Sequence, residues 1–131
     1  MATATPPPSC ERKAVLIVED EPLLLMDASD MVADAGYEPV EATCVREALE
    51  ILQRRDDIAI LFTDINLAGS SDGLELAREV AKRWPPIAVI VASGRHFLEP
   101  SALPKRARFM AKPYLPSDFN KVLADLTPVV W

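Results

Sequence analysis

Acidic residues follow two separate apolar stretches of the chain. Asp64 comes two residues after the apolar run 58–62 and precedes a segment rich in glycine and serine, and Glu19 and Asp20 follow the apolar run 14–18. Carboxylates that are crowded together repel one another, which raises at least one pKa unless a cation compensates. A hard divalent ion such as Mg²⁺, held by carboxylates, waters and phosphate oxygens, suits such a site. A carboxylate beside that ion can attack a phosphoryl group and form an aspartyl-phosphate, which is the chemistry we expect of Asp64.

Two further polar residues follow apolar runs and complete a set able to handle phosphate. Ser93 follows the run 87–92, and Lys112 follows 108–111. A hydroxyl can donate to a phosphoryl oxygen, and an ammonium can neutralise the added charge. The sequence therefore indicates a phosphoryl-binding site, provided that the fold brings these residues together.

Each of these residues also has an ordinary structural explanation. Asp64 and Ser93 suit turns, the acids at 19–21 suit the start of a helix, and Lys112 suits a solvated surface. The position of every one of them after a predicted strand favours the functional interpretation.

The pattern of apolar residues predicts five strands that alternate with helices. The predicted strands are 14–18, 37–42, 58–62, 87–92 and 108–111. The predicted helices are 22–35 with Pro22 in the first turn and Gly36 closing it, 45–52 running on to Arg54 and Arg55, 77–84 stopped by Pro85 and Pro86, a short helix within 95–104, and 119–126 behind a Ser117 cap. Such alternation is typical of an α/β fold with a parallel sheet and helices on both faces. Right-handed crossovers then place the carboxyl ends of all strands at one edge of the sheet.

Composition excludes several classes of function. The 131 residues suit one domain, and the formal net charge of −6 argues against a general attraction to nucleic acid. No apolar run approaches the roughly 20 residues that span a bilayer. Cys10, Cys44 and His96 lack metal-ligand spacing, so we expect cytoplasmic thiols and no zinc site. We expect residues 1–12, which are rich in alanine, threonine and proline, to be a disordered tail before a domain at 13–127, with a C-terminal tail at 128–131.

Five segments in this order resemble the receiver domain of response regulators. They are VLIVEDEP at 15–22, TDINL at 63–67, DGLEL at 72–76, VAS at 91–93 and MAKPY at 110–114, and the resemblance extends from about residue 13 to residue 126. It implies a flavodoxin-like, doubly wound five-stranded parallel sheet in the order 2-1-3-4-5, an order that is general for this type of fold.

The resemblance also implies roles for individual residues. Asp64 corresponds to the phosphoacceptor, and Glu19 and Asp20 to the acidic pair that binds Mg²⁺ together with Asp64. Asn66 corresponds to the position that offers its backbone carbonyl to the metal. Ser93 corresponds to the switch hydroxyl and Lys112 to the lysine that senses the phosphoryl group, and the bond between Lys112 and Pro113 is often cis in this family.

The chain departs from the common receiver pattern in three places. The loop between Asp64 and Gly73 is one residue longer than usual and lacks the usual proline. Phe109 stands at the aromatic switch position without a tyrosine hydroxyl. Gly94 follows Ser93 where alanine is usual, which is similar to the stand-alone receivers of the FAT GUY group, although Val91, Ser93 and Arg95 replace that group's phenylalanine, threonine and terminal glycine or tyrosine.

The leading hypothesis is a single-domain response regulator that is not a turnover enzyme. A sensor histidine kinase or a histidine phosphotransfer protein phosphorylates Asp64, and the output is a downstream protein target. A homodimer through the face of the fourth helix, fifth strand and fifth helix is a further expectation, with Phe97, Leu98, Tyr114 and Phe119 as an exposed patch or as core. Two alternatives stay open: a Mg²⁺-dependent phosphohydrolase that uses an aspartyl-phosphate, and a receiver-shaped docking module that is never phosphorylated.

Overall fold

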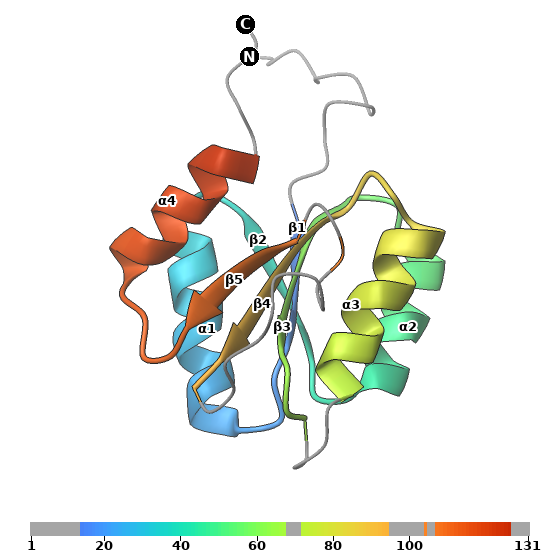
Figure 1. Ribbon diagram of the computed structural model, residues 1–131, viewed down its shortest axis with the longest axis horizontal. Coiled ribbons are helices and arrows are strands. Elements are labelled where there is room, and N and C mark those ends of the chain that lie inside the picture. The colour runs from blue at the N-terminus through green and yellow to red at the C-terminus, as the bar shows by residue number, and fades with distance from the viewer. Residues whose placement is uncertain (1–13, 68–71, 95–103, 105–106, 127–131) are drawn as a thin grey trace, which may run out of the picture.

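The computed structural model describes residues 14–67, 72–94, 104 and 107–126 (Figure 1). Within these ranges strands and helices follow one another along the chain. They are β1 (Ala14–Val18), α1 (Pro22–Asp34), β2 (Glu38–Ala42), α2 (Val45–Arg54), β3 (Ile58–Asp64), α3 (Asp72–Arg83), β4 (Ala88–Ser93), β5 (Arg108–Ala111) and α4 (Pro116–Leu126). In these residues no helix is long and apolar enough to cross a membrane.

The five strands form one parallel sheet in the order β2-β1-β3-β4-β5. This confirms the predicted fold class and strand order. In the register of the sheet Val18 pairs with Thr63, and Asp64 pairs with Ala92. The residues just after β1 therefore lie beside the end of β3, at the carboxyl edge where we expected the site.

Helices cover both faces of the sheet, with α1 and α4 on one face and α2 and α3 on the other (Figure 1). All five residues of β1 are buried because the strand is central and covered on both sides. Its side chains alternate between two cores: Leu16 packs with residues of α2 and α3, and Ile17 packs with residues of α1 and α4. Figure 1 shows this arrangement as two helical layers around the sheet.

The first helix begins and ends where the sequence predicts. Pro22 occupies the first turn, where its missing N–H needs no partner within the helix. The chain leaves the helix through Gly36, whose φ of 96° is in the region that glycine enters most readily. The ordinary explanation that the acids at 19–21 serve as helix caps does not hold for Glu21, which occupies the N-cap position and makes no capping hydrogen bond through its side chain.

The start of α3 corrects a prediction. Asp72 and Gly73 were expected in a loop, since aspartate, serine and glycine are common turn residues. The helix instead begins at Asp72, and the N–H of Gly73 donates a hydrogen bond of 3.0 Å to the carbonyl of Ile65. This contact with the chain just beyond β3 brings the first turn of α3 close to Asp64.

The closing helix also starts earlier than predicted. It begins at Pro116, so Ser117 lies inside the helix and is not its cap. The carboxylate of Asp118 accepts a hydrogen bond of 2.8 Å from the N–H of Leu115, which satisfies a backbone donor ahead of the helix. The predicted helix within 95–104 and the predicted tails at 1–12 and 128–131 lie outside the described residues, apart from Pro104.

Candidate functional site

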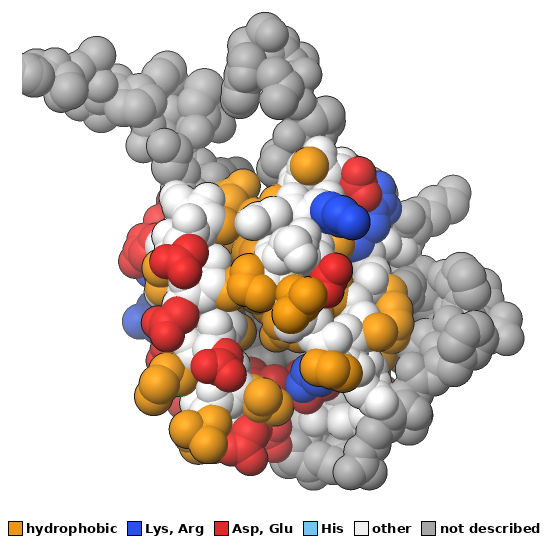
Figure 2. Space-filling model, turned by 90° about the vertical axis from the view of Figure 1, so that its left-hand side faces the viewer, with side chains coloured by type: hydrophobic (Ala, Val, Ile, Leu, Met, Phe, Trp, Pro, Cys, Tyr) orange, Lys and Arg blue, Asp and Glu red, His pale blue; other side chains and the backbone are white. Residues whose placement is uncertain are grey.

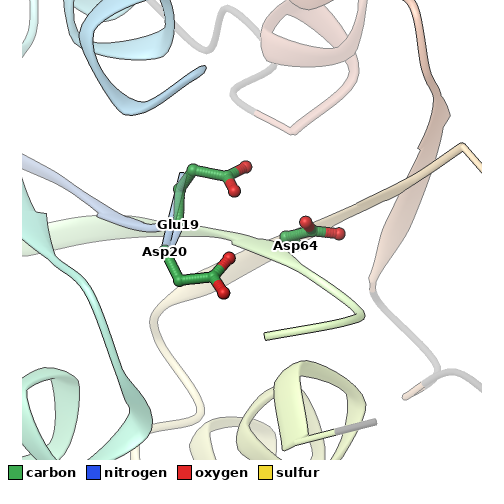
Figure 3. A group of neighbouring side chains, drawn as sticks. All are labelled: Glu19, Asp20 and Asp64. Carbon is green, nitrogen blue, oxygen red and sulfur yellow. The ribbon is translucent and has the colours of Figure 1, made fainter. Parts of the chain in front are cut away.

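Three carboxylates gather at the carboxyl edge of the sheet. Glu19 and Asp20 follow β1, and Asp64 is the last residue of β3 (Figure 3). One oxygen from each carboxylate lies within 4.8 Å of the others. β1 and β3 are neighbours in the sheet, and this pairing brings together acids that are more than 40 positions apart in the sequence.

Lys112 supplies a positive charge to this acidic group. Its Nζ lies 3.1 Å from Oδ2 of Asp64 and 3.2 Å from Oε1 of Glu19. The side chain of Lys112 is 20% exposed, and those of Glu19 and Asp64 are 9% and 12% exposed. The ammonium is thus held between two largely buried carboxylates.

Burial shifts the pKa values of Glu19 and Lys112 in opposite directions. Desolvation raises the pKa of Glu19, and the negative charge of Asp64 adds to the rise, while Lys112 opposes it. Burial alone would lower the pKa of Lys112, but its hydrogen bonds and its attraction to Asp64 and Glu19 outweigh burial, so this pKa is raised. Lys112 therefore stays protonated, and burial, with a smaller contribution from the charge of Asp64, disfavours the ionised form of Glu19.

Backbone N–H groups orient both acids. The N–H of Glu21 donates to Oε2 of Glu19 at 3.2 Å, and the N–H of Asn66 donates to Oδ1 of Asp64 at 3.3 Å. Each of these two carboxylates therefore accepts one hydrogen bond from the backbone and one from Lys112. The loop after β3 turns Asn66 back toward Asp64, which places the backbone of residue 66 beside the candidate metal site.

Ser93 is the last residue of β4 and only 2% exposed. Its carbonyl accepts a hydrogen bond of 3.0 Å from the N–H of Lys112. The preceding residue, Ala92, pairs with Asp64 in the sheet. Ser93 is thus tied through the backbone to Lys112 and lies one residue beyond the neighbour of Asp64.

Two further residues, Gly73 and Tyr114, lie at the site although their types did not predict a place there. A Cβ on Gly73 would overlap the backbone carbonyl of Asp64, so only glycine allows α3 to approach so closely. Tyr114 lines the small hollow beside Glu19, Asp64 and Lys112. Desolvation, together with Glu19, Asp64 and Asp27, raises the pKa of Tyr114 to about 12. Neither role was visible locally, because each depends on a contact with a distant part of the chain.

The structure describes two of the four residues that were expected to form either an exposed patch or core, Tyr114 and Phe119. Phe119 is fully buried and packs on Phe62 with the rings tilted and their centroids 5.4 Å apart. The ring of Tyr114 packs on the same residue at 5.7 Å. Phe97 and Leu98 lie outside the described residues. Phe119 is therefore core and not part of a dimer patch.

The donor set fits Mg²⁺. Hard cations take oxygen ligands, and Mg²⁺ commonly uses one or two carboxylates and keeps several waters. Glu19, Asp20 and Asp64 offer closely spaced oxygens, and Asp20 is exposed to solvent that can complete the coordination. A divalent charge here would also relieve the repulsion that raises the pKa of Glu19.

The chain belongs to the response regulator receiver domain family, which it matches over residues 15–123. The fold and the arrangement of acids and lysine at the edge of the sheet agree with that assignment. Members of this class are regulators in two-component signalling.

Particular relatives include the phyllosphere-induced regulator PhyR of Methylorubrum extorquens, which is 31% identical over 85% of this chain and 42% of the relative. The transcriptional regulatory protein PdtaR of Mycobacterium tuberculosis is 36% identical over 81% of this chain and 52% of the relative. The chain thus spans about half the length of these two relatives. A receiver protein of Sinorhizobium medicae has a similar crystal structure, with a TM-score of 0.78, 24% identity, and coverage of 86% of this chain and 92% of that one.

Proposed function

We propose that the protein is a phosphoacceptor of a two-component relay and receives a phosphoryl group on Asp64 in a Mg²⁺-dependent reaction. The donor is the phosphohistidine of a sensor histidine kinase or of a histidine phosphotransfer protein. The observation that carries the proposal is the position of the Lys112 ammonium between Asp64 and Glu19, at 3.1 and 3.2 Å. A largely buried acid that already contacts a cation is prepared to bear the additional negative charge of a phosphoryl group.

In the transfer, an oxygen of Asp64 forms a bond to phosphorus while the bond from phosphorus to the donor histidine nitrogen breaks. The N–H of Asn66 holds the Asp64 carboxylate in place during the attack. Lys112 then pairs with the phosphoryl oxygens, and the hydroxyl of Ser93 donates to one of them. Mg²⁺, held by Glu19, Asp20, Asp64 and the Asn66 carbonyl, would neutralise negative charge on the phosphoryl oxygens.

Exposed apolar side chains next to the site support a protein as the phosphodonor. Leu23 and Met26 in the first turns of α1 are 70% and 58% exposed, and Leu115 before α4 is 64% exposed. Figure 2 views the side of the molecule that carries α1 and α4, where hydrophobic and acidic side chains lie together on the surface. A protein that brings a histidine to Asp64 would bury these side chains.

The output of the proposed relay is a changed affinity for a downstream protein. Phosphorylation adds about −1.5 to −2 charges. When Lys112 and Ser93 turn toward the phosphoryl group, the ends of β4 and β5 move with them, since the two residues are joined by a backbone hydrogen bond. Binding partners select between the two arrangements by their different affinities. We place this exchange in the cytoplasm.

The proposal is tested with Mg²⁺ and acetyl phosphate as a small phosphodonor. We expect intact-protein mass spectrometry to show the gain of one phosphoryl group, absent when Mg²⁺ is chelated and absent in Asp64→Asn. Asp30→Asn, which neutralises an exposed acid on α1, is the matched control and should be phosphorylated normally. A phosphoryl group retained in Asp64→Asn would refute Asp64 as the acceptor.

A further inference from the structure

A groove of about 410 Å³ opens between α2 and α3, which lie side by side on one face of the sheet (Figure 1). Its lining consists of Val45 and Leu49 from α2 and Glu75, Leu76 and Glu79 from α3. The volume is in the range of about 300–1,000 Å³ that is usual for binding sites. The proposed phosphotransfer makes no use of this groove.

The base of the groove is apolar. Leu76 is 1% exposed and belongs to the core beneath the two helices. Val45 and Leu49 are half-buried and pack against the same core, so part of each side chain remains open to a partner. An aliphatic side chain placed here would remove this remaining apolar surface from water.

The α3 side of the groove is acidic. Glu75 and Glu79 are one turn apart, a spacing at which like charges repel on a helix. Glu79 pairs with Arg83 at 3.3 Å, in an ion pair whose two side chains are 41% exposed. Glu75 is exposed, and among the described residues no cation forms an ion pair with it. A positive charge in the groove would therefore find a carboxylate ready to pair with it.

We propose that this groove binds a segment of a partner protein in which aliphatic side chains are flanked by lysine or arginine. The aliphatic side chains contact Val45, Leu49 and Leu76, and the cations pair with Glu75 and Glu79. The charge pattern discriminates among partners. Nucleic acid and acidic segments are repelled by the glutamates, and a second copy of this chain carries a net charge of −6 itself.

The groove lies on the opposite face of the sheet from α1 and α4, so both faces can be occupied at once (Figure 1). Leu76 is one helical turn after Gly73, whose N–H bonds to the carbonyl of Ile65 just beyond Asp64. The lining of the groove is thus one turn away from the backbone of the phosphoacceptor. Docking here does not depend on the proposed phosphorylation and is tested on the unphosphorylated protein.

The test uses a synthetic helical peptide with leucines on one face and lysines on the other, titrated into the full chain with methyl-labelled valine and leucine. We expect saturable shifts of the methyl signals of Val45, Leu49 and Leu76. The double variant Glu75→Gln/Glu79→Gln should weaken binding about threefold to tenfold, the loss that two exposed ion pairs produce. The matched control is Asp30→Asn/Asp34→Asn, which removes the same charge from exposed positions one turn apart on α1 and should bind like the unchanged protein.

Four results would overturn the inference. Equal weakening in the two double variants would show that the peptide senses only net charge. If a peptide with glutamates in place of the lysines bound as tightly as the lysine peptide, the groove would not select positively charged partners. Absence of shifts at the groove methyls would show that the groove is not a docking site, and phosphorylation of Asp64 would be unaffected by that outcome. If sedimentation velocity instead showed a dimer that is lost in Glu75→Gln/Glu79→Gln, the occupant would be a second copy of the chain.

Discussion

The two edges of the parallel sheet hold the same arrangement of charge, one cation between two carboxylates, in different surroundings. At the carboxyl edge the cation is Lys112. At the opposite edge Arg55 lies 3.0 Å from Glu38 at the start of β2 and 2.7 Å from Asp57 just before β3. The side chains of Lys112, Glu19 and Asp64 are 9–20% exposed, and those of Arg55, Glu38 and Asp57 are 32–60% exposed.

The difference in exposure distinguishes the proposed binding site from an ordinary network of surface ion pairs. Exposed ion pairs contribute about 0–1 kcal/mol, because water already solvates both charges well. At the carboxyl edge, where water is largely excluded, the charges of Lys112, Glu19 and Asp64 interact more strongly. Loss of the Lys112 charge therefore leaves two largely buried carboxylates without a positive partner. The buried edge is therefore sensitive to any change of charge, including the arrival of Mg²⁺ or a phosphoryl group, whereas the exposed edge only ties neighbouring segments together.

The largest expected effect comes from adding a methyl group at each edge. Gly73→Ala places a Cβ on the carbonyl of Asp64, so the backbone of the proposed acceptor must shift. We expect the free energy of unfolding to fall by about 3 kcal/mol. We also expect phosphorylation by acetyl phosphate to be at least tenfold slower. Gly36→Ala meets no atom within 4 Å but strains a φ of 96°, which costs about 1–2 kcal/mol. Urea unfolding and the rate of mass gain measure the two effects. Normal phosphorylation of Gly73→Ala would contradict the proposed close approach.

The next effect comes from removing the cation at each edge. In Mg²⁺-free buffer at neutral pH, we expect Lys112→Met to lower the free energy of unfolding by about 2 kcal/mol, because two largely buried acids lose their partner. Arg55→Met should lower it by less than about 1 kcal/mol. Urea unfolding of both variants gives the comparison. Equal losses would mean that burial does not distinguish the two edges.

Addition of Mg²⁺ should stabilise the protein through the carboxyl edge of the sheet and not through the opposite edge. A ligand that binds only the folded state at ten times its dissociation constant stabilises it by about 1.4 kcal/mol. We expect this stabilisation in the unchanged protein and in Arg55→Met, and a much smaller one in Asp20→Asn, which lacks one of the proposed ligands. Thermal unfolding across a Mg²⁺ titration provides the measurement. Undiminished stabilisation of Asp20→Asn would remove Asp20 from the metal site.

The smallest expected effect is on pH dependence. The pKa of Glu19 is raised above 4.5 in the folded protein, so the folded state holds this proton more tightly than the unfolded state does. The free energy of unfolding therefore falls as pH rises from about 4.5 through the pKa of Glu19 in the folded protein. Above that pKa the contribution of Glu19 stays at its lower value. Glu19→Gln should remove this fall, which we would measure by urea unfolding in Mg²⁺-free buffer at a series of pH values. An identical pH profile in Glu19→Gln would show that the pH dependence of the free energy of unfolding does not come from Glu19.

Much of the fold could be predicted because its signals are local. Every described strand begins or ends within two residues of its predicted range, since runs of buried apolar residues mark strands in a covered parallel sheet. The predicted starts of α3 and α4 were wrong for a common reason. Gly73 and Asp118 are held by contacts with Ile65 and Leu115, and residue type alone does not reveal such contacts.

The order of the elements, and an acid, a serine or a lysine at the end of each of four apolar runs, can be read from the residues alone, because apolar periodicity and chain connectivity are local properties. The pairing of Lys112 with Glu19 and Asp64, from which it is separated by 93 and 48 positions, could be established only from the folded chain. The same holds for the groove between α2 and α3. Electrostatic strength and burial depend on distance in space and on the exclusion of water, and both arise only when the sheet and its helices have assembled.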